Sequence, residues 1–147
     1  MVWGCFSWYG VGALYHIKGI LKKEKYRQIL IHQMRPSARR LQGDDFVFQH
    51  DNDPKHTSLL VKNYLQNQQI EVLPWPPQSP DLNPIENLWS ELDHQTERRS
   101  CNSEELFKQL KEQWEKLSPD YLKKLVESMP RRCEKVIKSR GYPMTIK

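Results

Sequence analysis

Two acidic residues, Asp51 and Glu86, stand in local sequences that suit metal-dependent chemistry, with 34 residues between them. Asp51 closes the run FVFQHD (residues 46–51), where an alternating apolar stretch gives way to turn-forming residues. Glu86 follows Asn83 and Pro84, which favour the N-cap and the first position of a helix. The sequence therefore predicts one carboxylate at the end of a strand and one in the first turn of a helix.

Both acids also have an ordinary structural explanation. Glu86 occupies the third position of its predicted helix, where a capping-box Glu is common, and Asp51 could close an Asx turn. A mixed nitrogen and oxygen metal site made from His50, Asp51, Asp53 and His56 is a further alternative. Strand alternation disfavours that site, because His50 and Asp51 would point to opposite sides. Asp53 is interpreted as a turn residue, and His56 as a residue at the start of the next helix that could meet a phosphate.

Four stretches of the chain resemble the catalytic domain of the mariner superfamily of transposases, in the branch with 34 residues between its second acid and its final Glu. They are VWGCFSWYGVG (2–12), QHDNDPKHT (49–57), LPWPPQSPDLNPIENLW (73–89) and LVESMPRRCEKVI (125–137). The last two stretches are the most specific to the family. The resemblance covers nearly the whole chain.

This resemblance implies an α/β fold of the ribonuclease-H-like type, with a mixed sheet, an antiparallel hairpin, helices on both faces and a helical C-terminal tail. It implies metal-dependent cleavage and strand transfer of DNA in the nucleus, with Asp51 and Glu86 as catalytic residues and metal ligands. Two Mg²⁺ or Mn²⁺ ions would serve the site. Transposon ends and target DNA would be the partners, and a homodimer is left open.

The family site uses three carboxylates, and the first lies on a strand just upstream of the segment that matches residues 2–7. Met1 stands directly before that segment, and the first acidic residue is Glu24. We therefore expect residues 1–147 to form a single partial catalytic domain without its first central strand or a helix-turn-helix region, inactive by itself. The alternatives are a non-catalytic module that binds nucleic acid or a partner protein, and a nuclease that recruits another acid.

Charge is distributed unevenly along the chain, whose formal net charge is +5. Residues 1–43 carry eight basic groups and one acid, residues 44–120 seven and fifteen, and residues 121–147 eight and two. An acidic middle between basic ends suits a cation site beside surfaces that follow phosphates, although a solvated lysine-rich surface is the alternative. The candidate DNA-binding residues are Lys22, Lys23, Arg39, Arg40, His56, Lys123, Lys124, Arg131 and Arg132.

Composition adds two expectations about the surroundings of the protein. Three cysteines without a C-x-x-C pair indicate a reducing compartment rather than a disulfide framework. The sequence has no apolar run typical of a signal peptide or a membrane span, so no membrane partner is expected.

The elements that must position these residues follow from hydrophobic periodicity and turn signals. Strands are predicted over residues 2–7, 13–18, 46–51 and 70–75. Helices are predicted over residues 22–41, 58–66 and 84–98, another is capped by Ser103, and a further one starts at Ser118. Pro130 interrupts this last helix, and the apolar stripe of Cys133, Val136 and Ile137 continues to a stop at Gly141. Trp89 and Trp114 lie on apolar stripes and are expected in the core, whereas Trp75, among prolines, is the candidate for an exposed contact.

Overall fold

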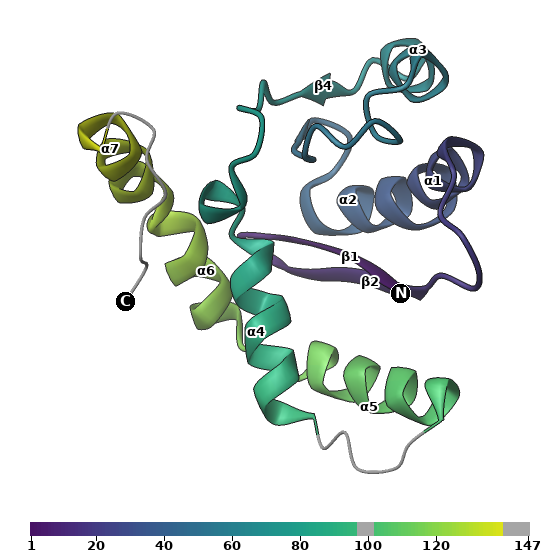
Figure 1. Cartoon of the computed structure of the whole chain (residues 1–147), viewed down its shortest axis with the longest axis vertical. Coiled ribbons are helices and arrows are strands. Elements are labelled where there is room, and N and C mark those ends of the chain that lie inside the picture. The colour runs from purple at the N-terminus through teal and green to yellow at the C-terminus, as the bar shows by residue number, and fades with distance from the viewer. Residues whose placement is uncertain (97–101, 140–147) are drawn as a thin grey trace. The chain divides into compact units, whose positions relative to one another are not determined.

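The computed structural model describes residues 1–96 and 102–139 (Figure 1). Its strands are β1 (Val2–Ser7), β2 (Gly10–His16), β3 (Val47–Phe48) and β4 (Glu71–Val72). Its helices are α1 (Lys23–Ile29), the π-helical turn η1 (Leu30–Met34), α2 (Arg35–Gln42), α3 (Leu59–Asn67), the 3₁₀ turn η2 (Pro80–Leu82), α4 (Ile85–Gln95), α5 (Ser103–Glu115), α6 (Pro119–Glu127) and α7 (Met129–Lys138). Within the described ranges, no helix is both long and apolar enough to cross a membrane.

The chain divides into two compact units. The first contains Met1–Cys5 and Gly12–Gln78, and the second contains Phe6–Val11 and Ser79–Lys147. The first unit therefore holds most of the hairpin, the helices α1 to α3 and the pair β3–β4, and the second holds the hairpin tip and the helices from η2 onward. Asp51 belongs to the first unit and Glu86 to the second.

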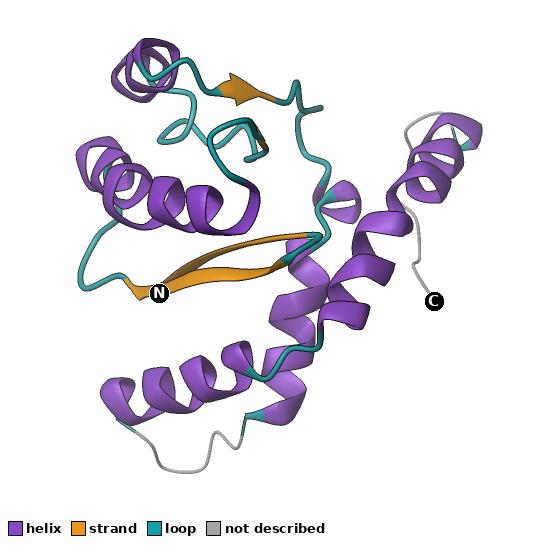
Figure 2. Ribbon diagram, turned by 180° about the vertical axis from the view of Figure 1, so that it is seen from behind, coloured by secondary structure: helices purple, strands orange, loops and turns teal. Residues whose placement is uncertain are grey.

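The described strands form two small sheets, where the sequence predicts one mixed sheet (Figure 2). A two-residue turn joins β1 and β2 into an antiparallel hairpin, and β3 runs parallel to β4, with Phe48 opposite Val72. The strands predicted over 46–51 and 70–75 were therefore too long, because only two residues of each are paired. In a two-stranded ladder each strand is hydrogen-bonded along one edge only, and such a ladder has marginal stability. The segment that leads to Asp51 therefore continues as a loop.

One long helical segment confirms the helix predicted over residues 22–41. It consists of α1, η1 and α2 in direct succession (Figure 1). Pro36 lies inside this segment, where a proline has no N–H to donate and its ring crowds the preceding turn. The wider π-helical turn precedes it, and the N–H of Arg35 donates to the carbonyl of Leu30, five residues back. Hydrophobic periodicity does not report such a change in helix type.

The core of the first unit joins this long helix to β3 and α3. Its buried members are Tyr26, Leu30, Met34, Phe48, Val61 and Leu65. Beside this core the hairpin meets α2 at Gly12, where an added Cβ would lie 2.8 Å from the Cβ of Ser37 and closer still to the Sγ of Cys5. The Ser37 hydroxyl also accepts a hydrogen bond from the N–H of Ala13, at 2.9 Å. Only a glycine permits this close crossing.

The second unit is built on helices with well-defined N-terminal caps. Ser118 caps α6 as predicted, since its hydroxyl accepts from the N–H of Tyr121 at 3.1 Å. Asn102, not Ser103, caps α5 through hydrogen bonds from residues 104 and 105 at 3.0 and 2.9 Å. Trp114 is 1% exposed and its ring stacks on that of Trp89, with centroids 5.4 Å apart, which confirms the predicted core position of Trp114. The helix α4 ends at Gln95, earlier than the predicted residue 98, because Thr96 takes an extended backbone conformation. The predicted stop at residue 141 lies outside the described residues.

Candidate functional site

Asp51 lies in the loop after β3, and its side chain is 55% exposed. Its Oδ1 accepts a hydrogen bond from the N–H of Asp53 at 3.1 Å, which is the geometry of an Asx turn. The same oxygen contacts Nδ1 of His56. Asp51 therefore forms the Asx turn that the sequence offered as an alternative. The same Asp51 carboxylate also contacts His56.

Asp53 is a turn residue, as the sequence predicts. Its Oδ1 accepts from the N–H of Lys55 at 2.9 Å, and its Oδ2 pairs with the Lys55 ammonium at 2.8 Å. Its carbonyl accepts from the N–H groups of His56 and Thr57 at 2.8 and 3.0 Å. Partial burial opposes ionisation of Asp53, yet the bonds and charge of Lys55, together with His56, lower its pKa. Asp53 thereby shapes the turn that brings His56 back to Asp51.

His50 and His56 pack against a buried tyrosine beneath this loop. The ring of Tyr26 stacks on His56 with centroids 4.0 Å apart, and its hydroxyl lies 2.9 Å from Nδ1 of His50. Burial, together with the charges of Asp51 and Asp53, raises the pKa of the Tyr26 hydroxyl, which therefore stays protonated and donates. Burial, with a contribution from His56, lowers the pKa of His50 to about 4. His50 is thus a neutral ring whose Nδ1 accepts, and this ring also stacks on that of His56, with centroids 5.6 Å apart.

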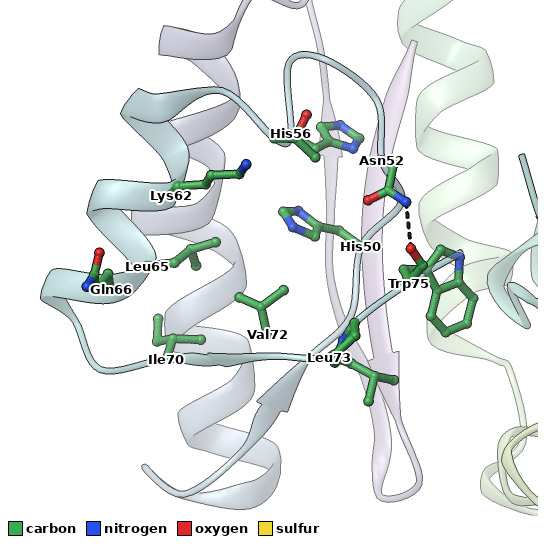
Figure 3. Close-up of a pocket in the computed structure, with 12 residues that line it drawn as sticks. His50, Asn52, His56, Lys62, Leu65, Gln66, Ile70, Val72, Leu73 and Trp75 are labelled. Carbon is green, nitrogen blue, oxygen red and sulfur yellow. Dashed lines mark hydrogen bonds between the residues drawn. The ribbon is translucent and has the colours of Figure 1, made fainter. Parts of the chain in front are cut away.

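A pocket of about 400 Å³ opens beside the two histidines in the first unit (Figure 3). Figure 3 shows the side chains of Lys62 and His50 pointing toward one another across it, above an apolar floor that includes Leu65 and Val72. Trp75 lines the pocket edge, and its carbonyl accepts from the Asn52 side chain at 2.6 Å. Trp75 is only partly exposed, so the exposed contact predicted for it is at most a partial one.

Glu86 is exposed in the first turn of α4. The helix begins one residue later than predicted, with Pro84 at the N-cap position and Asn83 before it. The Oδ1 of Asn83 accepts from the N–H of Ile85 at 3.3 Å, and the Asn83 carbonyl accepts from the N–H of Glu86 at 3.2 Å. The buried Leu88 and Leu92 anchor the same helix in the second unit. Glu86 therefore sits where the sequence predicts it, on the outer side of a well-anchored helix.

Most of the basic residues predicted to bind DNA are exposed. In the first unit these are Lys22, Lys23, Arg39 and Arg40, and in the second they are Lys124 and Arg131. Arg39 pairs with Asp44 at 2.5 Å across an exposed surface, and Lys123 is partly buried with its ammonium 6.0 Å from the ring centroid of Trp8. His56 is 17% exposed and is engaged with Asp51.

Arg132 does not belong to the exposed basic surface that the sequence predicts. It is 8% exposed, and its guanidinium donates to the Ser128 hydroxyl, the Asp81 carbonyl and the Asn87 side chain. Cys133 and Ile137, which were expected to form the buried stripe of α7, are instead exposed, Ile137 to 76%. The helix α7 therefore buries the face that carries Arg132 and exposes Cys133 and Ile137. This is possible because buried acceptors satisfy the N–H donors of the Arg132 guanidinium.

Asp51 and Glu86 supply the hard oxygen donors that Mg²⁺ and Mn²⁺ prefer. Each is exposed within its own unit. Among residues 1–96 and 102–139, no group of three or more His, Cys, Asp or Glu side chains is arranged to hold a metal ion. Each of the two acids therefore has the chemistry to bind a divalent ion.

Two contacts near the acids, Tyr26 with His50 and Asn87 with Arg132, are not predicted by the sequence. Helical periodicity places Tyr26 only on the apolar face of the helix over residues 22–41, and no sequence signal singles out Asn87. Both contacts join residues far apart in the chain, 24 residues for Tyr26 and His50 and 45 for Asn87 and Arg132. The single available signal was Arg132 itself, which stands at helical spacing between Met129 and Val136 on the face that proves to be buried.

A model of the family described as DDE superfamily endonuclease matches residues 16–111, a segment that contains both acids. The chain is 46% identical over 144 residues to the transposable element Tcb1 transposase of Caenorhabditis briggsae. That alignment covers 97% of this chain and 53% of the relative, so the chain spans about half the length of the curated relatives it matches.

Two solved structures share its fold. The first is the Mos1 transposase catalytic domain with raltegravir and Mg, which is 27% identical with a TM-score of 0.87 over 98% of this chain and 75% of that one. The second is the Mos1 transposase paired-end complex with left transposon end, which is 28% identical with a TM-score of 0.85 over 98% of this chain and 44% of that one. These similarities confirm the predicted ribonuclease-H-like fold.

Proposed function

The chain belongs to the DDE superfamily of endonucleases, and on that premise we propose that it forms part of a transposase catalytic domain that cuts and joins DNA strands. The observation that carries the proposal is the 46% identity to a transposable element transposase across 97% of the chain. The family match also runs through both acids, and the fold agrees with that of a transposase catalytic domain.

Asp51 and Glu86 would be ligands of divalent ions, Mg²⁺ or Mn²⁺, in this proposal. Both are exposed carboxylates, and such ligands suit these ions. Two bound ions would activate the attacking oxygen and stabilise the leaving oxygen at a phosphodiester. The solved Mos1 structure that contains Mg supports this assignment.

The residues around Asp51 orient its carboxylate. The Asx turn and the contact to His56 both use Oδ1, so the carboxylate is held in one direction although it is exposed. His56 is in turn fixed by stacking on the buried Tyr26. A ligand oriented in advance loses less conformational freedom when an ion binds, which is the usual role of groups that surround a metal ligand.

DNA would be the partner. The exposed basic residues Lys22, Lys23, Arg39, Arg40, Lys124 and Arg131 offer phosphate contacts without sequence selectivity. A Mos1 complex with its transposon end supports DNA as the ligand of this fold. A protein that acts on chromosomal DNA in a nucleated cell must work where that DNA lies, so a nuclear location is part of the proposal.

The experiment that tests the metal site is titration with Mn²⁺, followed by electron paramagnetic resonance of the free ion. Asp51→Ala and Glu86→Ala should each weaken Mn²⁺ binding by about tenfold or more, because each removes a charged ligand. Asp45→Ala and Glu112→Ala are matched controls, since they remove exposed acids elsewhere in the same two units. Equal effects of all four substitutions would mean that the ion responds to net charge, and would favour the non-catalytic alternative.

A further inference from the structure

The helix α7 buries an arginine and exposes an isoleucine. Arg132 is 8% exposed, while Ile137 is 76% exposed on the same helix. Burial of a guanidinium is unfavourable unless its donors find acceptors, and burial lowers the pKa of Arg132 from its ordinary value. The donors of the Arg132 guanidinium must therefore be satisfied by acceptors within the second unit.

The guanidinium joins three segments of the second unit. Its Nε donates to the Ser128 hydroxyl at 2.8 Å, at the junction of α6 and α7. Its Nη1 donates to the Asp81 carbonyl in η2 at 3.2 Å, and its Nη2 donates to Oδ1 of Asn87 in the first turn of α4 at 2.9 Å. The Ser128 hydroxyl itself donates to the carbonyl of Leu125 at 2.6 Å. The Ser128 hydroxyl, which accepts from Arg132 at the end of α6, is therefore itself held in place.

The first turn of α4 is closed by backbone hydrogen bonds from Glu86 to the Asn83 carbonyl and from Asn87 to the Pro84 carbonyl, both at 3.2 Å, while side-chain capping there is limited. The N-cap position is occupied by Pro84, which provides no side-chain cap. The Asn83 side chain reaches the N–H of Ile85 only at 3.3 Å, which is long for a hydrogen bond of this type. The contacts of Arg132 to η2 and to Asn87 bracket this weakly capped turn on both sides.

A favourable interaction with the α4 dipole does not explain why the charged Arg132 lies beside the start of this helix. A cation near a helix N-terminus meets the positive end of the helix dipole, which is unfavourable. Its value must therefore lie in the geometry that three separate acceptors impose.

We propose that Arg132 is a positioning residue for Glu86: it fixes the first turn of α4 through Asn87 and the η2 carbonyl, and so sets the direction of the adjacent carboxylate. The inference rests on the proposed function for the role of Glu86 as a metal ligand. The placement of the turn by Arg132 is independent of that role and can be measured separately.

The test compares Arg132→Ala, Arg132→Lys and Asn87→Ala with Lys135→Ala, all in the full chain. Lys135 is an exposed cation on the same helix, so its removal controls for the lost charge. Lysine keeps the charge of Arg132 but concentrates its donors on one nitrogen, which cannot serve three separated acceptors. Asn87→Ala removes one acceptor and leaves the Ser128 and Asp81 contacts intact, which guards against a failure to fold.

Two readouts are needed. Amide hydrogen exchange of residues 80–90 measures how firmly the first turn is held, and Mn²⁺ broadening of the Glu86 amide resonance measures the ion site. In all three test variants, exchange should accelerate several-fold within residues 80–90 alone, and Mn²⁺ affinity should fall by about tenfold, as is typical for groups that orient a ligand. Lys135→Ala should leave both quantities within about twofold of the unmodified chain, as a surface substitution does.

Exchange that is unchanged in folded Arg132→Lys and Asn87→Ala would overturn the inference, whatever the ion does. Accelerated exchange with Mn²⁺ affinity equal to that of the unmodified chain would also overturn it, since the turn would then not orient Glu86. Restoration of both readouts by lysine would assign the effect to charge and reject positioning. If Mn²⁺ broadens the resonances of the Glu86→Ala chain as strongly as those of the unmodified chain, the proposed function fails. The hydrogen-exchange rates would still show whether Arg132 fixes the first turn of α4.

Discussion

The hydroxyl of Tyr26 lies 2.9 Å from Nδ1 of His50, the residue that directly precedes Asp51. Tyr26 is 1% exposed and belongs to the core of the first unit, and its ring also stacks on His56, which contacts Asp51. One buried side chain thus fixes both histidines that flank the acidic loop. The packing of Tyr26 in the core therefore helps to fix the position of Asp51, the candidate metal ligand.

Removal of the Tyr26 hydroxyl should destabilise the protein. Tyr26→Phe leaves the partly buried Nδ1 of His50 without its donor, so we expect a loss of about 1–3 kcal/mol in the free energy of unfolding. Tyr64→Phe is the matched control, because the Tyr64 hydroxyl is buried and has no hydrogen-bond partner within the described part of the chain. Urea unfolding followed by circular dichroism gives both values. Similar losses in the two variants would show that the hydrogen bond contributes little.

Crowding at Gly12 should make this position intolerant of a side chain. Gly12→Ala places a methyl group against the Cβ of Ser37 and the Sγ of Cys5, and we expect a loss of about 1–3 kcal/mol from overpacking. Cys5→Ala removes the nearest atom, so the double variant should be less destabilised than the sum of the two single variants. Thermal or urea unfolding of the three variants measures the coupling, and strict additivity would argue against the predicted clash.

The thiols of Cys5 and Cys133 should differ in reactivity. Burial raises the pKa of Cys5 to about 11, although the hydrogen bond to Ser37 acts in the opposite direction, whereas Cys133 is exposed. Since the thiolate is the reactive form, iodoacetamide at pH 8 should modify Cys133 well before Cys5, as peptide mass spectrometry would show. The unfolded Cys5 thiol, with its ordinary pKa of 9.0, ionises first, so its contribution to stability should decline as pH rises from 9 toward 11. Equal labelling rates in the folded chain would refute the burial argument.

Binding of duplex DNA should depend on the exposed basic residues near α6 and α7. Reversal of Lys123, Lys124 and Arg131 to Glu should weaken binding and reduce the slope of log affinity against log salt by about one for each lost phosphate contact. Arg132 is left unchanged because its guanidinium is buried. Reversal of Lys108, Lys111 and Lys116 in and after α5 is the control with the same charge change. Fluorescence anisotropy at several salt concentrations separates the two sets, and equal losses would indicate a response to net charge alone.

Cleavage of DNA should require a further carboxylate beside Asp51 and Glu86. We expect the 147-residue chain to nick supercoiled plasmid negligibly in Mg²⁺ or Mn²⁺, since two ions need more ligands than two carboxylates provide. Robust metal-dependent nicking by the 147-residue chain, lost in Asp51→Ala, would show that another acid already completes the site.

Local elements and family membership follow from linear patterns in the sequence. Turn and cap signals placed the hairpin, the start of α3 near residue 58 and the Ser118 cap of α6, all of which the structure contains. Apolar periodicity placed Trp114 in the core. These features depend on neighbours within a few residues, so a linear pattern contains the information they need.

The contacts around the two acids depend on tertiary structure. The unpaired segment after Phe48, the contact of Tyr26 to His50 and the burial of Arg132 against Asp81 and Asn87 all depend on segments 24 to 51 residues away. An arginine is normally placed at the surface because its isolated burial is unfavourable. Whether distant acceptors satisfy its donors is set by the packing of α7 on η2 and α4, and no local pattern in the sequence encodes that packing.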